Sequence, residues 1–118
     1  AVTGLNPRFR FYRYEPGQQF KRHLDGRVRL DSGEVSRVTL MFYLNEECDG
    51  GETVFSNWGF PMGKSFEEEI RVSPATGSAL FFTHECWHEG APVRAGVKYV
   101  LRTDVLYAGE PEPKHPSA

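Results

Sequence analysis

Short apolar runs alternate with polar turns along the chain, and no segment carries the apolar spacing of an amphipathic helix. Residues 8–14 alternate and are rich in strand formers, which favours a strand, and a turn is expected at Pro16 and Gly17. A second short strand is expected over residues 19–24. Residues 36–44 form the longest apolar segment, which predicts a central strand buried on both faces.

Further strands are predicted after this central one, with turns at 46–51 and 74–77. They lie at residues 52–55, 70–72, 79–82 and 97–102. Residues 26–34 are polar and resemble a mobile flap, and residues 56–69 are expected to be irregular because glycine and proline recur there. About eight short strands separated by turns predict a mainly all-β fold, either a β-sandwich or a jelly-roll barrel with a site at its mouth.

Length and charge narrow the classes of function. With 118 residues, one domain is expected, with a core over 1–109 and a solvated tail over 110–118. The net charge of −2 gives no basic field for a nucleic acid, and no apolar run reaches the roughly 20 residues of a membrane span. The oligomeric state is left open.

The two cysteines, Cys48 and Cys86, are too few to indicate a disulfide scaffold. We expect two free thiols in a reducing compartment, which favours a cytoplasmic location.

Two separated motifs indicate a metal site. His23 and Asp25 stand two positions apart on a predicted strand, where side chains share a face, and His88 lies far downstream. Two histidines and one carboxylate form the facial triad that holds non-haem Fe(II) and leaves three coordination positions open. The plainer alternative is a surface His-Asp pair and a buried, hydrogen-bonded histidine.

A zinc site is a weaker alternative. His84, Cys86 and His88 alternate along one segment, but a closed zinc site needs four ligands at familiar spacings. His84 is therefore expected to line the entrance of the site or to pack locally.

A candidate cation for a dicarboxylic cosubstrate follows His88. Lys98 lies ten residues later on an apolar strand, although it could also be a lysine that extends from a strand end to solvent. Arg102 is the second candidate, since it shares the strand face with Lys98 but stands roughly 13 Å away.

These motifs together resemble a known family. The matching residues are Tyr14, His23-Leu24-Asp25, Leu44-Asn45, the run 50–55, and His88-x-Gly90-x-Pro92-Val93-x-x-Gly96-x-Lys98. The chain resembles the Fe(II)- and 2-oxoglutarate-dependent oxygenases, in their prolyl 4-hydroxylase-like branch, over residues 8–107. The resemblance implies a double-stranded β-helix, or jelly-roll, core. The helices that support this core upstream in the family are missing here, so the chain resembles a catalytic core cut from a longer protein.

The resemblance also implies roles for single residues. His23, Asp25 and His88 are the expected iron ligands, and Lys98 is the expected partner of the distal carboxylate of 2-oxoglutarate. Tyr14 matches a family tyrosine whose hydroxyl helps to hold the same cosubstrate. Two further residues are candidates from their place on strands: Thr39, as a hydroxyl donor, and Arg102, as the alternative cation.

The implied activity is oxidative decarboxylation of 2-oxoglutarate to succinate and CO₂, coupled to hydroxylation of a C–H bond. Fe(II), 2-oxoglutarate, O₂ and the reductant ascorbate are the implied cofactors. A prolyl or other peptide residue is the expected substrate, chosen by the loops 26–34 and 56–69. Asp25 argues against a halogenating variant. The alternatives are a hydroxylase of a small molecule or free amino acid, and a non-catalytic, cupin-like module that binds a metal or a peptide.

Overall fold

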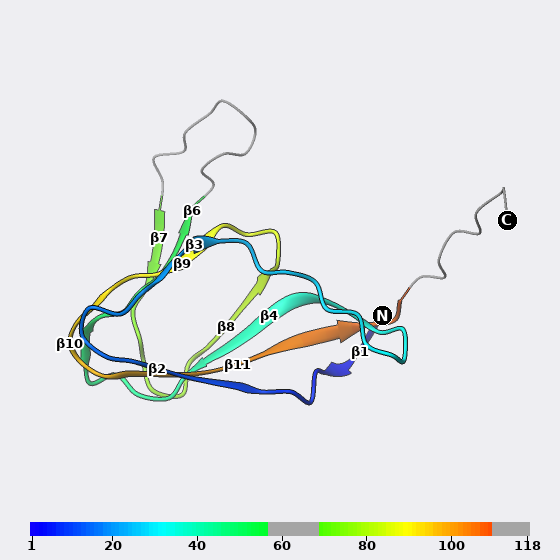
Figure 1. Cartoon of the computed structure of the whole chain (residues 1–118), viewed down its shortest axis with the longest axis horizontal. Coiled ribbons are helices and arrows are strands. Elements are labelled where there is room, and N and C mark those ends of the chain that lie inside the picture. The colour runs from blue at the N-terminus through cyan, green and yellow to red at the C-terminus, as the bar shows by residue number, and fades with distance from the viewer. Residues whose placement is uncertain (57–68, 110–118) are drawn as a thin grey trace, which may run out of the picture.

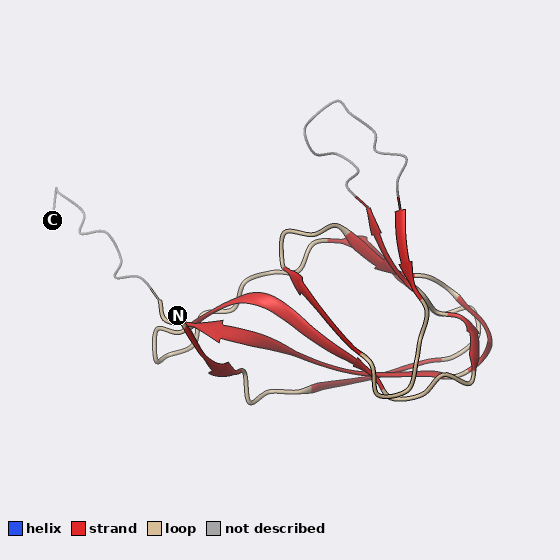
Figure 2. Ribbon diagram, turned by 180° about the vertical axis from the view of Figure 1, so that it is seen from behind, coloured by secondary structure: helices blue, strands red, loops and turns tan. Residues whose placement is uncertain are grey.

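The computed structural model describes residues 1–56 and 69–109, and every regular element in these two ranges is a strand (Figures 1 and 2). The described part of the chain therefore has no helix that could span a membrane. The strands are β1 (Val2–Leu5), β2 (Arg10–Tyr14), β3 (Phe20–His23), β4 (Val35–Tyr43), β5 (Cys48–Gly50), β6 (Thr53–Ser56), β7 (Glu69–Val72), β8 (Ala79–Thr83), β9 (His88–Gly90), β10 (Val93–Gly96) and β11 (Lys98–Tyr107).

The larger sheet is built around β11 and β4. Its order is β1-β11-β4-β8, and β2 pairs with the first half of β11, from Lys98 to Arg102. β1 pairs with the last residues of the same strand. All of these pairs are antiparallel. Along each strand, successive side chains point alternately to an inner and an outer face of the sheet.

The smaller sheet has the order β3-β9-β6-β7 and lies opposite the larger one, as Figures 1 and 2 both show. The antiparallel pair β5 and β10 joins the two sheets at one end, while the N-terminus lies at the other end. This arrangement is the jelly-roll fold that the strand pattern predicts, and the all-β prediction is confirmed.

Register decides which side chains of the larger sheet face the smaller one. Val100 lies beside Tyr43, Arg102 beside Met41, and Asp104 beside Thr39. The inner face therefore changes along the strands, from apolar at Val100 and Tyr43 to polar at Asp104 and Thr39. Thr39 and Tyr43 on the inner face are almost fully buried, and so is the outward Leu40, but the outward Val38 and Phe42 are only partly buried, so the predicted burial on both faces is confirmed only in part.

The predicted strands 8–14, 19–24, 36–44, 52–55, 70–72, 79–82 and 97–102 all have counterparts in the structure. The turn predicted at 46–51 is wrong in part, because β5 occupies its centre and pairs with β10. The expected flap at 26–34 is instead closed as a hairpin, since Ser36 N–H donates to Val28 O and Leu30 N–H to Glu34 O. Its end lies beside β1, where the Thr3 hydroxyl donates to Glu34. Most of the irregular segment 56–69 and the tail 110–118 lie outside the described residues.

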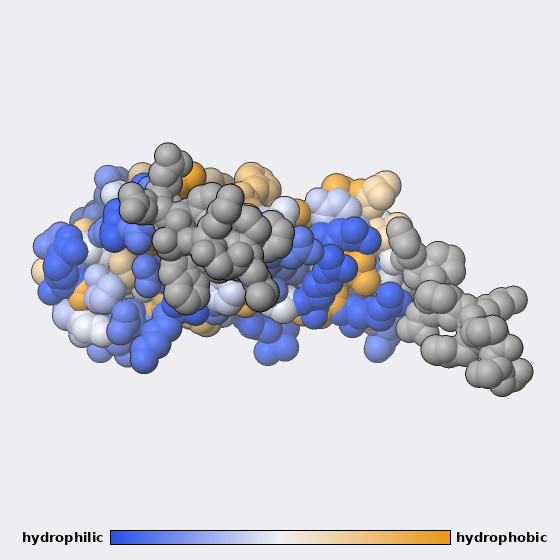
Figure 3. Space-filling view, turned by 90° about the horizontal axis from the view of Figure 1, so that it is seen from above, coloured by the Kyte–Doolittle hydropathy of each residue, from blue (hydrophilic) through white to orange (hydrophobic). Residues whose placement is uncertain are grey.

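Hydrophilic side chains dominate the face seen from above in Figure 3, with hydrophobic ones scattered between them. The exposed aromatic side chains Phe11 and Phe81 alternate with residues that line the space between the sheets, so they belong to the outer face of the larger sheet. The polar inner residues thus lie between the sheets, away from this apolar outer face.

Substitution of Gly96 provides a test of the pairing of β5 with β10. Its φ is +76°, and a Cβ at this position would lie 2.4 Å from the Glu47 carbonyl oxygen. Gly77 has a similar φ of +80° with nothing within 4 Å, so it is a matched control. We expect Gly77→Ala to cost about 1–2 kcal/mol of unfolding free energy from its backbone conformation alone. Gly96→Ala should cost about 1–3 kcal/mol more because of the collision. Equal midpoints of urea unfolding for the two variants would contradict this packing.

Candidate metal centre

Three side chains that can bind a metal converge between the two sheets. His23 ends β3 and His88 begins β9, and the two residues are direct partners across this antiparallel pair. Asp25 follows β3 by two residues, and its Oδ1 lies 3.3 Å from His23 Nε2 and 3.5 Å from His88 Nε2. The ligand atoms of all three lie within 4.8 Å of one another. Asp25 and His88 are buried, whereas His23 is partly exposed.

Backbone hydrogen bonds orient both imidazole rings. His23 Nδ1 lies 2.6 Å from the Lys21 carbonyl oxygen, and His88 Nδ1 lies 2.9 Å from the Cys86 carbonyl oxygen. A carbonyl can only accept, so Nδ1 carries the proton in each ring. In the neutral imidazole this leaves the Nε2 lone pair free, and Nε2 is the atom turned toward Asp25.

Asp25 is held as a carboxylate. Burial by itself raises the pKa of Asp25, but the contacts of its carboxylate with His23 and His88, the hydrogen bond from Thr39 and the positive charge of Arg102 outweigh burial. The pKa of Asp25 therefore lies well below its usual range. Two imidazole nitrogens and one carboxylate oxygen, each free to bind a metal at the same point, fit the donor set of non-haem Fe(II).

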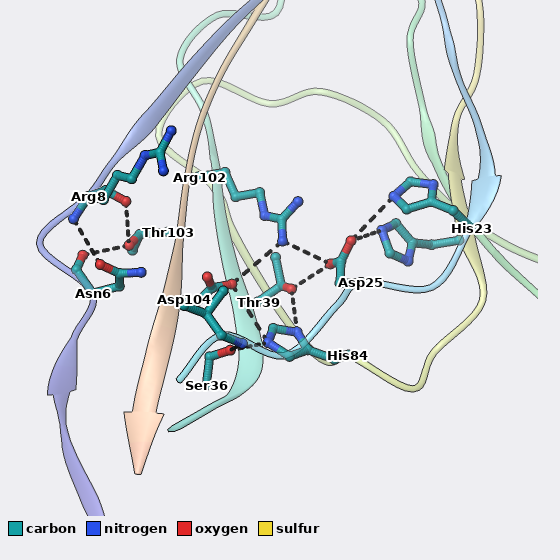
Figure 4. A network of polar contacts seen from close by, with 12 residues as sticks. Asn6, Arg8, His23, Asp25, Ser36, Thr39, His84, Arg102, Thr103 and Asp104 are labelled. Carbon is teal, nitrogen blue, oxygen red and sulfur yellow. Dashed lines mark hydrogen bonds and ion pairs between the residues drawn. The ribbon is translucent and has the colours of Figure 1, made fainter. Parts of the chain in front are cut away.

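The second oxygen of Asp25 faces the larger sheet (Figure 4). Thr39 Oγ1 donates to Asp25 Oδ2 at 2.6 Å, and Arg102 Nη2 lies 3.4 Å from the same oxygen. Arg102 also lies 3.5 Å from Asp104 Oδ1. Both Thr39 and Arg102, expected as possible cosubstrate groups, are thus engaged by the Asp25 carboxylate in this structure.

Of the two alternatives expected for His84, a place at the entrance is wrong, because His84 is 2% exposed and is packed within this polar network. Among the described residues, only His23, Asp25 and His88 form a group of three or more side chains placed to hold a metal ion. His84 and Cys86 stand outside this group, so the zinc alternative has no geometric support in the described ranges. Cys86 and Cys48 are both free thiols.

A cavity of about 50 Å³ extends from the three residues toward β2 and the start of β11. Lys98 lines it and is 3% exposed, yet it makes no hydrogen bond or ion pair with any described residue. Its ammonium lies 4.8 Å from the centre of the Tyr14 ring. Burial lowers the pKa of Lys98 to about 8. Burial also raises the pKa of Tyr14 to about 12, so the Tyr14 hydroxyl stays neutral and able to donate.

Sequence reasoning missed the aromatic wall around the histidines. The Phe20 ring stacks on His23 with centroids 4.0 Å apart, and Phe82 lies 4.5 Å from His88. Tyr12 lines the cavity together with Tyr14, and their two-residue spacing on one strand was a signal that could have identified it. Phe20 and Phe82 had no comparable signal, because an aromatic residue on a strand is usually part of the core.

Comparisons with known proteins agree with this geometry. Residues 9–103 match the family model described as the 2OG-Fe(II) oxygenase superfamily. A relative from Arabidopsis thaliana, named probable prolyl 4-hydroxylase 4, is 30% identical over 110 residues, which covers 74% of this chain and 37% of that protein.

Two solved structures share the fold. The crystal structure of a prolyl-4-hydroxylase from Pseudomonas putida is 27% identical with a TM-score of 0.60, over 82% of this chain and 50% of that one. The collagen prolyl hydroxylase of Paramecium Bursaria Chlorella virus-1, in its 2OG complex, is 26% identical with a TM-score of 0.57, over 88% and 63%. The chain thus spans less than two thirds of each of these proteins.

We expect His23→Ala, Asp25→Ala and His88→Ala each to weaken binding of Mn(II), because each removes one of three converging ligand atoms. The loss in affinity should exceed the roughly 10- to 100-fold loss that is typical when an outer partner of a ligand is removed. Mn(II) titration followed by electron paramagnetic resonance measures this, with circular dichroism to confirm folding. Cys86→Ser is the control and should bind as the wild type does; an equal loss in this variant would favour the His84-Cys86-His88 alternative.

Proposed function

The chain belongs to the 2OG-Fe(II) oxygenase superfamily, and we propose that it forms the iron- and cosubstrate-binding core of a hydroxylase that acts on prolyl residues of peptides. One observation carries this proposal: a two-histidine, one-carboxylate cluster shares its cavity with a buried ammonium that has no ion pair among the described residues. Such a cavity suits a dicarboxylate that binds a metal at one end and a cation at the other.

His23, Asp25 and His88 would hold the iron. When bound, Fe(II) would supply the activation of O₂ that couples oxidative decarboxylation of 2-oxoglutarate to hydroxylation of a C–H bond. Asp25 would bind through Oδ1, because Thr39 and Arg102 occupy Oδ2. With only these three protein ligands, the ion would keep coordination positions for the cosubstrate and O₂.

Lys98 would bind the distal carboxylate of 2-oxoglutarate. A buried ammonium without a partner is costly, and a carboxylate from the cosubstrate would compensate for its lost hydration. The Tyr14 hydroxyl is a further donor at this end of the cavity, since Tyr14 is the direct β2 partner of Lys98. Arg102 is the weaker candidate because Asp25 and Asp104 already engage its guanidinium.

The prime substrate would approach the metal past the aromatic wall. Phe20 and Phe82 flank the two histidines and offer an apolar surface, which suits the aliphatic ring of a prolyl residue better than a charged group. The relatives named as prolyl hydroxylases support a peptide substrate. A small-molecule or amino-acid hydroxylase is the second candidate. We further propose ascorbate as the reductant that keeps the iron in the Fe(II) state.

The test is a turnover assay with Fe(II), 2-oxoglutarate, O₂ and ascorbate, with and without a proline-rich peptide. We expect succinate to form slowly without the peptide and faster with it, together with a gain of one oxygen mass in the peptide. Asp25→Ala should form no succinate above the background. A wild-type chain that binds Mn(II) and 2-oxoglutarate but never forms succinate would instead be a non-catalytic binding module.

Lys98 and Arg102 can be separated by their effect on cosubstrate binding. Lys98→Ala should weaken 2-oxoglutarate several hundredfold, because removing one partner of a buried charge pair costs about 3–5 kcal/mol. Lys98→Arg should also weaken it, since the guanidinium is larger and directs its donors differently. The dissociation constants are measured by calorimetry with Mn(II) under anaerobic conditions. Loss of binding in Arg102→Ala with unaltered metal affinity, and normal binding in Lys98→Ala, would move the assignment to Arg102.

The pH dependence of the same constant provides a second check. The pKa of Lys98 is lowered to about 8, so the free protein loses this positive charge as the pH rises through that value. Wild-type affinity for 2-oxoglutarate should therefore fall between pH 7 and 9, by up to tenfold per pH unit above the pKa. The weaker affinity of Lys98→Arg should stay constant over this range, because a guanidinium remains charged.

A further inference from the structure

A continuous series of hydrogen bonds leads from the backbone of the 28–36 hairpin to Asp25, and its part from Ser36 to Asp25 is drawn in Figure 4. Val28 N–H donates to Ser36 Oγ at 2.8 Å, and Ser36 Oγ lies 2.9 Å from His84 Nε2. His84 Nδ1 lies 3.0 Å from Thr39 Oγ1, which donates to Asp25 Oδ2. Ser36, Thr39 and His84 are each at most 2% exposed, so water does not compete for these groups.

The donor and the acceptor of every hydrogen bond in this series can be assigned by starting from Asp25. Asp25 is ionised and can only accept, so the single proton of the Thr39 hydroxyl points to Asp25. Thr39 Oγ1 must then accept from His84, which places the His84 proton on Nδ1. Nε2 is left as an acceptor for the Ser36 hydroxyl, whose oxygen in turn accepts from Val28 N–H. Each of the three side chains thus has one assigned donor role and one assigned acceptor role.

We propose that His84 is a positioning residue for Asp25: by donating from Nδ1 to Thr39 it directs the Thr39 proton onto Oδ2, so that Oδ1 alone faces His23 and His88. Without this donor, the Thr39 hydroxyl can rotate away and both carboxylate oxygens become free to turn toward the metal. Binding through both oxygens would occupy a coordination position that the reaction needs. The inference rests on the proposed function, because it assumes that Asp25 is a metal ligand.

Arg102 also touches Asp25 Oδ2, but its effect is of another kind. Its contact is an ion pair at 3.4 Å, and it is shared with Asp104. The Arg102 contact is long and lacks hydrogen-bond geometry, so it mainly supplies charge, whereas the 2.6 Å hydrogen bond from Thr39 fixes the orientation of the oxygen. His84 also accepts Asp25 N–H at its backbone oxygen, at 3.2 Å, and substitutions of the side chain retain this contact.

Two substitutions of His84 distinguish the role of Nδ1, which donates to Thr39, from the role of Nε2, which accepts from Ser36. In His84→Asn, the amide NH₂ can take the place of Nδ1–H and still donate to Thr39, while the contact with Ser36 is lost. His84→Gln can retain a group near Nε2 but lacks the donor to Thr39. Thr39→Val removes the hydroxyl with little change in shape. Glu85→Gln is the matched control from the same turn, because the Glu85 side chain is 79% exposed.

Mn(II) affinity of the chain, measured by electron paramagnetic resonance, is the main readout, and the melting temperature of the metal-free chain reports on packing. We expect His84→Gln and Thr39→Val to lose roughly 10- to 100-fold in affinity, with His84→Asn and Glu85→Gln close to the wild type. In the Thr39→Val background, His84→Gln should have no additional effect, because His84 acts through Thr39. The Co(II)-substituted His84→Gln variant should also show an altered ligand-field spectrum if both carboxylate oxygens bind.

Three results would overturn the inference while leaving the metal site intact: wild-type affinity in His84→Gln, equal losses in the Asn and Gln variants, or a full His84→Gln effect without the Thr39 hydroxyl. A measurement without any variant is nitrogen-15 NMR of the metal-free wild type, which should find the His84 proton on Nδ1; a proton on Nε2 alone would also overturn it. Failure of the wild-type chain itself to bind Mn(II) would contradict the proposed function instead.

Discussion

Asp25 retains a negative charge at a position where burial opposes it, and the rest of the site is arranged around this requirement. An unpaired buried carboxylate costs several kcal/mol and would normally take up a proton. Here two imidazoles face one oxygen, and a hydroxyl and a guanidinium face the other. Asp104 then partly balances the guanidinium, and His84 lies 3.8 Å from the same Asp104 oxygen. Asp25, Thr39 and Arg102 therefore occur together because each of them compensates a charge or a hydrogen-bonding group of its neighbour, whereas Asp104 Oδ1 accepts no hydrogen bond from a described residue.

The two cations on β11, Lys98 and Arg102, line different parts of the same cavity. Lys98 and Arg102 point to the same side of the strand four residues apart, which corresponds to roughly 13 Å. The planar guanidinium of Arg102 can bridge two carboxylates, and it lies between Asp25 and Asp104. The compact ammonium of Lys98 lies near Tyr14 and Gly90, and a Cβ on Gly51 would lie 2.9 Å from Lys98 Cδ. Glycine at this position leaves the room that the buried lysine needs. Strand periodicity alone places Lys98 and Arg102 on the same face, so it cannot decide which of them binds the cosubstrate. Only the residues around each cation distinguish them.

Local patterns in the sequence were sufficient for the long strands and the convergence of His23 and Asp25, because a two-residue spacing on an extended chain has one geometric outcome. The strands β1, β5, β9 and β10 were not predicted, because each is short and contains a glycine, a residue that is depleted in strands, and because each depends on distant partners for its hydrogen bonds. The role of His84 was also out of reach. Its contacts, Ser36 and Thr39, are more than forty residues away, and a histidine next to a turn gives no sign of burial. Register between β4 and β11, which brings Thr39 to Asp104, cannot be read from either strand alone.

The site also links the two sheets, and this explains why its supporting residues are as buried as its ligands. His23 and His88 belong to the smaller sheet, whereas Thr39 and Arg102, which hold Asp25, belong to the larger one. Asp25 contacts both the two histidines and the pair Thr39 and Arg102, and His88 also packs on Phe82 of the larger sheet, with ring centroids 4.5 Å apart. A metal at this point would connect the sheets directly, and any ion that binds the folded state alone stabilises it in proportion to the logarithm of its concentration. On the side of the larger sheet, Thr39 donates to Asp25, and the series through His84 and Ser36 extends this contact to the backbone at Val28.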